Sequence, residues 1–296
     1  MTTGPDDLVT GAVDLHYHSA PSPFPRKLDP AEAARHYDAA GFRAVVLKSH
    51  HHNTVMDVLT IKSAVLDGLR LQVFGGIALN GTVGGLNPRA VELSLRMGGK
   101  IVWFPTMASH PHIEHHAQAT ASGFPTSTLE LMPEEPITVL DGEGKLKPEV
   151  HQIIELIREE DAILASGHLS PREIFVVFEA AKAAGVEKLV VQHPDFVIGL
   201  SEDEARRLAS MGAHIEHSIG MYARERDDRP IGRLQEWIEV VGVDRTTLGS
   251  DVGQATSPSP ADTFRKVAQL LVEHGTHEND VRKMVSDNPA GLLGLN

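Results

Sequence analysis

Cysteine is absent from this sequence of 296 residues. The absence excludes disulfides and thiolate metal sites, so any metal ion must be held by His, Asp, Glu or a modified Lys. No apolar run approaches the roughly 20 residues that a membrane-spanning helix needs. Residues 1–7 contain neither a basic segment nor an apolar stretch, so we expect no signal peptide. These absences favour a cytoplasmic protein that does not contact membranes.

Positive charge is also scarce, because 27 Lys and Arg stand against 40 Asp and Glu, a net charge of −13. Such a balance argues against nucleic-acid binding and favours a small-molecule substrate. The hydrophobic content of 41 % allows a sizeable core, and this length suits one large α/β domain. Histidine is abundant instead: 17 are present, many of them near predicted strand ends.

Short apolar segments alternate with helical segments along the chain. The continuous apolar character of several of them is typical of parallel strands that are buried on both faces. Eight strand–helix units close most simply into a (β/α)8 TIM barrel, an α/β fold, with right-handed crossovers. A doubly wound open sheet is less favoured because no Gly-rich phosphate loop follows the first strand. The predicted strands are 13–18, 43–47, 71–74, 100–105, 162–168, 188–193, 213–218 and 247–251.

One long insertion, 106–147, follows the fourth strand of this single predicted domain, 1–296. We expect a loop that carries His110, His112, His115 and His116, then a small hairpin over 137–146 with an Asp-Gly turn. Insertions of this length in compact barrels are usually functional, so a lid is predicted. A short C-terminal helix is expected over about 278–286.

The first predicted strand ends in His16-Tyr17-His18, and its two histidines point to the same side. All strand carboxyl ends of a barrel face one mouth. Imidazoles and a carboxylate gathered there suit Zn²⁺ or a similar divalent ion. For any single one of these histidines, a structural role is as good an interpretation as metal binding. Five ligand-type residues at strand ends together favour a metal site. The predicted ligands are His16, His18, His168, His193 and Asp251.

This order of residues resembles that of the amidohydrolase superfamily, with His-x-His after strand one, His after strands five and six, and Asp after strand eight. The ending, 288–294, is also similar to that of the family. The resemblance implies a divalent metal, zinc first and Mn²⁺ or Fe²⁺ as alternatives, with one or two ions, and often a homo-oligomer. The metal would lower the pKa of its bound water towards ~7. Asp251 would orient that water and take its proton. Lys48 or His50 would stabilise the oxyanion or hold a substrate carboxylate.

The sequence departs from binuclear members of that superfamily at the end of strand four. Those enzymes often carry a carboxylated Lys or a Glu there, whereas residues 103–107 contain neither. Lys48-Ser49-His50 is similar to the Thr-Asp-His of polymerase-and-histidinol-phosphatase barrels, but the acidic residue after their third strand is missing. The number of metal ions therefore stays open, as does the participation of Lys48, His50, His110 or His217.

The preferred function is hydrolysis of an amide, imide or lactone bond. A mononuclear-zinc decarboxylase or hydratase is the second hypothesis. A phosphoesterase is the third; it predicts several cations near the metal, for which Lys48 and Arg89 are candidates. A metal-storing or scaffold barrel without activity is the last. Phe24, Trp103 and Phe104 are expected to form an apolar wall at the mouth.

Overall fold

The strands of the computed structural model, which describes residues 4–118, 127–224 and 229–295, all run parallel. They form two hydrogen-bonded sheets, in the orders β1-β2-β3 and β4-β5-β6-β7-β8-β9. Their bounds are β1 (Val13–His18), β2 (Ala44–Lys48), β3 (Gln72–Phe74), β4 (Gly76–Ala78), β5 (Ile101–Trp103), β6 (Ile163–Ala165), β7 (Leu189–Gln192), β8 (His214–Ser218) and β9 (Thr246–Gly249).

The two sheets join at both edges into a closed barrel. At one seam β3 and β4 are halves of a single strand, interrupted at Gly75, and they pair with β2 and β5 respectively. At the other seam the Asp251 N–H donates to the His16 carbonyl (2.8 Å) and the His18 N–H donates to the Val252 carbonyl (3.0 Å). The predicted eight-stranded barrel is therefore confirmed, with its third strand divided in two.

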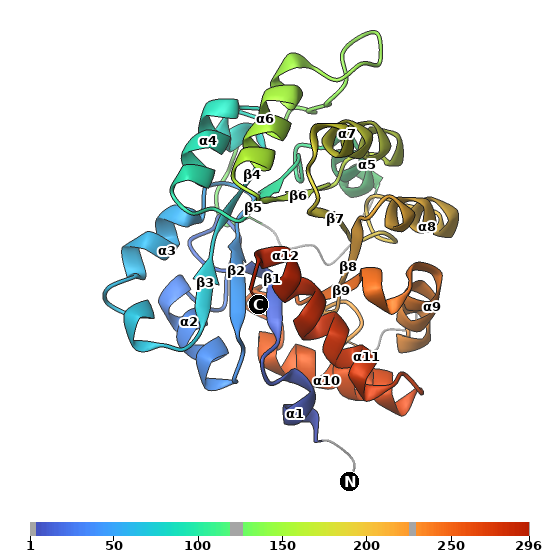
Figure 1. The fold of residues 1–296 in the computed structure, drawn as a ribbon. Coiled ribbons are helices and arrows are strands. Elements are labelled where there is room, and N and C mark those ends of the chain that lie inside the picture. Colours follow the sequence, from blue (N-terminus) through green and yellow to red (C-terminus); the bar gives the residue numbers. More distant parts are fainter. Residues whose placement is uncertain (1–3, 119–126, 225–228, 296) are drawn as a thin grey trace.

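Eight helices surround the barrel and follow its strands in turn (Figure 1). Side chains cap three of these helices: Asp29, Ser170 and Ser201 each accept a hydrogen bond from the backbone N–H three residues on, which satisfies a donor that the helix itself cannot. The helices are α2 (Pro30–Ala39), α3 (Val55–Ile61), α4 (Pro88–Arg96), α6 (Pro148–Glu159), α7 (Pro171–Ala184), α8 (Glu202–Ser210), α9 (Ile231–Val241) and α10 (Pro260–Glu273).

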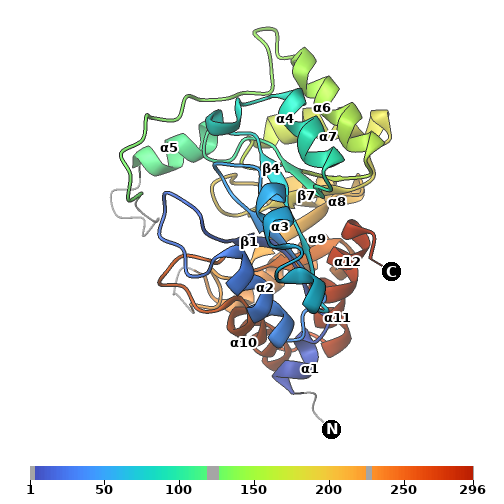
Figure 2. The same ribbon diagram turned by 90° about the vertical axis from the view of Figure 1, so that its left-hand side faces the viewer.

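The amino-terminal end of the barrel is filled by the C-terminal segment. Leu292 and Leu293 of α12 (Asn288–Leu293) pack on the interior cluster that includes Val13, Leu15 and Trp103. The predicted terminal helix, about 278–286, divides into α11 (Glu278–Arg282) and the π-helix η4 (Lys283–Asp287), and α12 follows as a further helix that was not predicted. In Figure 2, α12 lies at one end of the barrel, and α5 and the long loops lie at the other. Only the carboxyl end of the barrel is thus left for a site.

The expected loop over the histidine-rich part of the insertion was wrong. Residues His110–Gln118 form a helix, α5. The missed signal is Ser109 before Pro111, because the Ser109 hydroxyl accepts from the His112 N–H (3.2 Å) as a helix cap does. Residues 119–126 of the predicted lid lie outside the described residues. The predicted hairpin is reduced to one antiparallel bridge between Leu140 and Leu146.

Short elements complete the described chain. The helix after β2 ends at Ile61, and a 3-10 turn follows before β3. No helix in the described ranges is long and apolar enough to cross a membrane. The remaining elements are α1 (Pro5–Val9), η1 (Leu66–Gly68), η2 (Gly81–Val83) and η3 (Val243–Arg245).

Candidate active site

A β-bulge in β1 turns His16 and His18 into the mouth of the barrel. The pairing of β1 with β2 shifts register between Asp14 and Tyr17. Val13 and Leu15 face the barrel interior before the bulge, and the two histidines face it after the bulge. Tyr17 points outward, where its ring packs against Tyr37. Strict alternation could not place both sets inward, so the extra residue re-aims the histidines.

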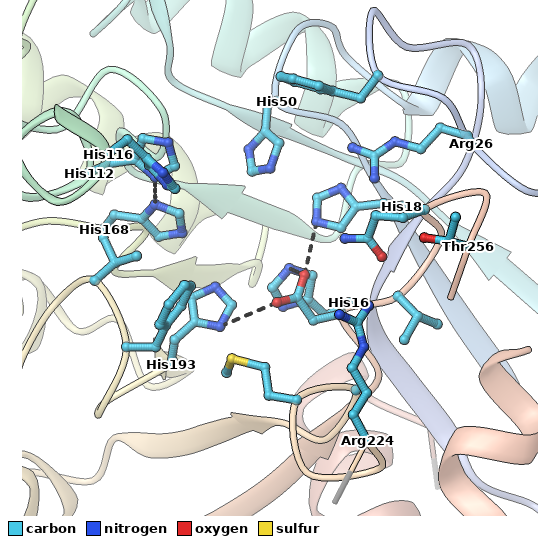
Figure 3. A pocket seen from close by; sticks show the side chains of 18 of the residues that line it. His16, His18, Arg26, His50, His112, His116, His168, His193, Arg224 and Thr256 are labelled. Atoms are coloured by element: carbon cyan, nitrogen blue, oxygen red, sulfur yellow. Dashed lines mark hydrogen bonds and ion pairs between the residues drawn. The ribbon is translucent and has the colours of Figure 1, made fainter. Parts of the chain in front are cut away.

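Four of the five predicted ligands lie together at the carboxyl end (Figure 3). Asp251 Oδ1 lies 3.1 Å from His16 Nε2 and 3.2 Å from His18 Nε2, and Asp251 Oδ2 lies 3.6 Å from His193 Nδ1. Ligand atoms of His16, His193 and Asp251 all lie within 4.8 Å of one another, which makes these three residues a possible metal site.

The protonation of these groups fits a divalent cation. Burial lowers the pKa of His193 to about 3, and burial holds the pKa of His18 well below its ordinary value. Burial alone would raise the pKa of Asp251, but His16 and His193 hold it well below its ordinary value. Neutral imidazoles and an ionised carboxylate are the forms that bind metal ions.

Strained backbone supports two of these side chains. His193 and Asp251 adopt left-handed conformations, with φ of 44° and 49°. A non-glycine residue in this region costs on the order of 1–3 kcal/mol and persists where the surroundings impose it. The His193 ring is further held by the Ser218 hydroxyl, 2.5 Å from its Nδ1. Such strain is concentrated at functional sites, which agrees with the convergence of these residues.

Glu216 orients His16 from behind. The His16 Nδ1–H donates to Glu216 Oε1 (2.7 Å), and both residues are fully buried. This bond places the His16 lone pair on Nε2, toward Asp251, in the arrangement typical of a metal-binding histidine. Gly249 provides the space, since a Cβ there would lie 2.9 Å from the Glu216 carboxyl carbon and 3.2 Å from the His16 Cβ.

Lys48, at the end of β2, lies in the same cluster. Its Nζ donates to His16 Nε2 (2.9 Å), and it lies 5.3 Å from the centre of the Trp103 ring. Burial lowers the pKa of Lys48 to about 8, although Asp251 and Glu216 oppose that shift. The ammonium is therefore poorly solvated and close to the reacting groups.

His50 lies beside His18, with ring centres 4.7 Å apart. Its Nδ1 lies 2.9 Å from the Thr106 hydroxyl, which also accepts from the Asn80 amide (2.7 Å). The Asn80 orientation is set because its Oδ1 accepts from the Thr106 N–H (2.9 Å). This network favours a hydroxyl donating to Nδ1, which leaves an N–H on His50 Nε2 for the pocket.

His168, the fifth predicted ligand, faces the insertion. Its Nδ1 lies 3.0 Å from the Nδ1 of His112 on α5, and the two rings stack. Its ring centre is 5.2 Å from that of His193. The Nε2 of His168 is buried without a hydrogen-bond partner. His168 thus lies next to the three-residue cluster without being part of it.

Other candidates point elsewhere. His217 faces outward from β8 against Trp237, with ring centres 6.1 Å apart, and it does not line the cavity described below. The His110 side chain is 64 % exposed and pairs with Glu114. The predicted wall of Trp103 and Phe104 was wrong because both are fully buried in the core; of the three, Phe24 lines the pocket. His51 and His52 are half-buried, and Arg89, the second candidate cation, is exposed on α4.

A cavity of about 580 Å³ opens above the cluster. His112, Arg26, Arg224 and Arg229 line it, and the sequence analysis missed them as site residues. The arginines lie in the loops after β1 and β8. A search for cations in strand–helix loops would have found them, because those loops build the mouth of a barrel.

Comparisons with known proteins agree with this architecture. A family model described as "Family of unknown function (DUF6282)" matches residues 11–216. The chain belongs to this family. The matched region runs from β1 to β8 and stops before Asp251. No curated protein matches the sequence.

Solved structures of similar fold cover nearly the whole chain. An amidohydrolase from Pseudomonas aeruginosa has a TM-score of 0.63 at 13 % identity, over 98 % of both chains. A lactonase from Listeria monocytogenes has a TM-score of 0.59 at 17 % identity, over 99 % of this chain and 97 % of that one. An organophosphorus hydrolase variant from Deinococcus radiodurans has a TM-score of 0.55 at 17 % identity, over 99 % and 95 %. The resemblance to the amidohydrolase superfamily is confirmed at the level of the fold.

Proposed function

We propose that this protein is a metal-dependent hydrolase that cleaves an amide, imide or lactone bond of a small molecule. One observation carries the proposal: ligand atoms of His16, His193 and Asp251 lie within 4.8 Å of one another at the carboxyl end of a barrel. The amidohydrolase, lactonase and organophosphorus hydrolase of similar fold support it. The cavity volume of about 580 Å³ suits a small substrate.

His16, His193 and Asp251 would hold the ion, with His18 or His168 as further ligands, and zinc suits these donors best. When bound, the ion would polarise the scissile carbonyl and lower the pKa of water. Asp251 would orient the attacking water through a carboxylate oxygen, accept its proton and return it to the leaving group. The Lys48 ammonium and His50 Nε2–H would stabilise the developing oxyanion.

Elemental analysis of the purified protein, followed by a screen of amides, imides and lactones, tests the proposal. His16→Ala or His168→Ala is expected to lower the bound metal, because each removes an imidazole donor. Asp251→Asn is expected to retain most of the metal and to lose at least about 100-fold in turnover, the contribution of a general base. Unchanged metal content in both histidine variants would refute the ligand assignment.

A mononuclear decarboxylase or hydratase is the second candidate. It is favoured by the single three-ligand group in the described ranges, although that group includes His193, which this candidate would leave free. Two ions per chain would favour the hydrolase, and one ion would favour this alternative. The arginines near the cluster also fit the phosphoesterase reading better than Arg89 does. A substrate screen should therefore include phosphate esters.

A further inference from the structure

The charge of the cavity is opposite to that of the whole protein. The chain carries a net charge of −13, yet three arginines and one carboxylate, Asp251, line the cavity. Arg229 is already neutralised, because its guanidinium donates to Asp195 Oδ2 (2.8 Å). Arg224 is exposed and donates to the Ser257 hydroxyl (3.2 Å), a neutral partner. Among the residues that the structure describes, Arg26 and Arg224 therefore keep a net positive charge available to a ligand.

Arg26 is held in place by its backbone. It forms an antiparallel bridge with Gln254. Next to this bridge, the Lys27 N–H donates to the Gly253 carbonyl (2.8 Å), and the Ala255 N–H donates to the Pro25 carbonyl (3.1 Å). The loop after β1 is thus paired with the loop after β9. A cation on such a braced segment needs little reorganisation to bind a ligand.

The Arg26 guanidinium has no acidic partner. No carboxylate in the described part of the chain lies within ion-pair distance, and Nε is buried without an acceptor. Its carbon lies 5.9 Å from the centre of the Phe24 ring. The charge of Asp251 acts on Arg26 only from beyond ion-pair distance. Burying a charge without a bonded counter-charge is costly, so a site that does so is suited to bind an anion. Figure 3 shows Arg26 and Arg224 on one side of the pocket, with His18 and His16 between them.

We propose that Arg26, with Arg224 as a second cation, binds an oxyanion group of the substrate, a carboxylate or a phosphoryl group. The planar guanidinium forms paired hydrogen bonds with either group. An anion held there lies beside His18, so the bond to be cleaved would extend toward Asp251. That this anion belongs to the substrate rests on the proposed function. The site would then prefer anionic over neutral molecules of equal shape.

Calorimetric titration with three probes tests this preference: isophthalate, phenyl phosphate and the neutral isophthalamide. The full chain is used as purified and again after chelator treatment, so that direct binding of an anion to metal is excluded. At least one anion is expected to bind about tenfold or more tightly than the diamide. The tighter anion identifies the carboxylate or the phosphoryl group.

Variants assign the preference to residues. Arg26→Gln should abolish it, Arg26→Lys should keep part of it, and Arg224→Gln should reduce it. Arg206→Gln is the matched control, because it removes the same charge from an exposed residue of α8 that pairs with Asp203. Circular dichroism shows whether each variant folds. If Arg26→Gln does not fold, Arg26→Lys and Arg224→Gln test the assignment in its place.

Three outcomes would overturn the inference. The parent could bind the anions and the diamide equally, it could bind no anion, or a folded Arg26→Gln variant could keep the preference for anions. Measurements on the chelator-treated protein distinguish a failure of this inference from a failure of the proposed function. Anion preference without any hydrolytic activity would refute only the hydrolase, and hydrolysis of neutral lactones without anion preference would refute only the anion site.

Discussion

Glu216→Gln isolates the contribution of the buried carboxylate to metal binding. Glu216 Oε1 accepts from His16 Nδ1–H at 2.7 Å, with both side chains removed from water. A hydrogen bond to a charged group is worth about 1.5–3 kcal/mol, and a neutral one about 0.5–1.5 kcal/mol. The amide would still accept this bond, so the expected loss is about 1–1.5 kcal/mol. That loss corresponds to roughly tenfold weaker binding, the lower end of the 10–100-fold range for such partners.

Competition with a chromophoric zinc chelator measures this change in affinity. Glu236→Gln is the matched control, because its carboxylate is 62 % exposed on α9 and should leave zinc binding unchanged. The free energy of unfolding of the metal-free protein should not fall in proportion, since the substitution also removes the cost of burying a charge. Equal zinc affinities for Glu216→Gln and the parent would refute the orientation of His16 by Glu216.

Two further predictions concern the frame of the site. Gly253→Ala should lower the free energy of unfolding in urea by roughly 2 kcal/mol or more, because φ is +134° and a Cβ would overlap the His18 carbonyl oxygen. Gly275→Ala is the control, because φ there is +99° and the space around it is open. An equal loss of stability in the two variants would contradict the steric reason. His217→Phe should reduce the loss of stability at acid pH. In the parent, burial lowers the pKa of His217 to about 4 from 6.5, so the unfolded state binds more protons than the folded state. The stability of the parent therefore falls by up to about 3 kcal/mol as the pH drops from about 6.5 to about 4, and the Phe variant lacks this contribution. An unchanged pH dependence of the unfolding midpoint in the Phe variant would contradict this assignment.

Local patterns predicted the elements well where hydrophobic runs and caps coincide. The Asp29, Ser170 and Ser201 caps and the strand ending in His16 and His18 are local features, so the sequence was sufficient for them. The helix α5 was missed because its histidines suggested a loop and its Ser109 cap was overlooked. The division of the third strand at Gly75 depends on two different neighbours and has no local signal.

The sequence alone predicted the barrel and five ligand-type residues at its carboxyl end, of which four lie together, because strand order and side-chain alternation are properties of the local chain. Only the tertiary structure decided that Glu216 orients His16, that His168 turns to His112, and that His217 packs outward on Trp237. It also decided that Arg26 lines the cavity with no carboxylate of the described ranges within ion-pair distance. These outcomes depend on a bulge, on glycines that admit close contacts, and on loops far apart in the chain, none of which a periodic pattern encodes.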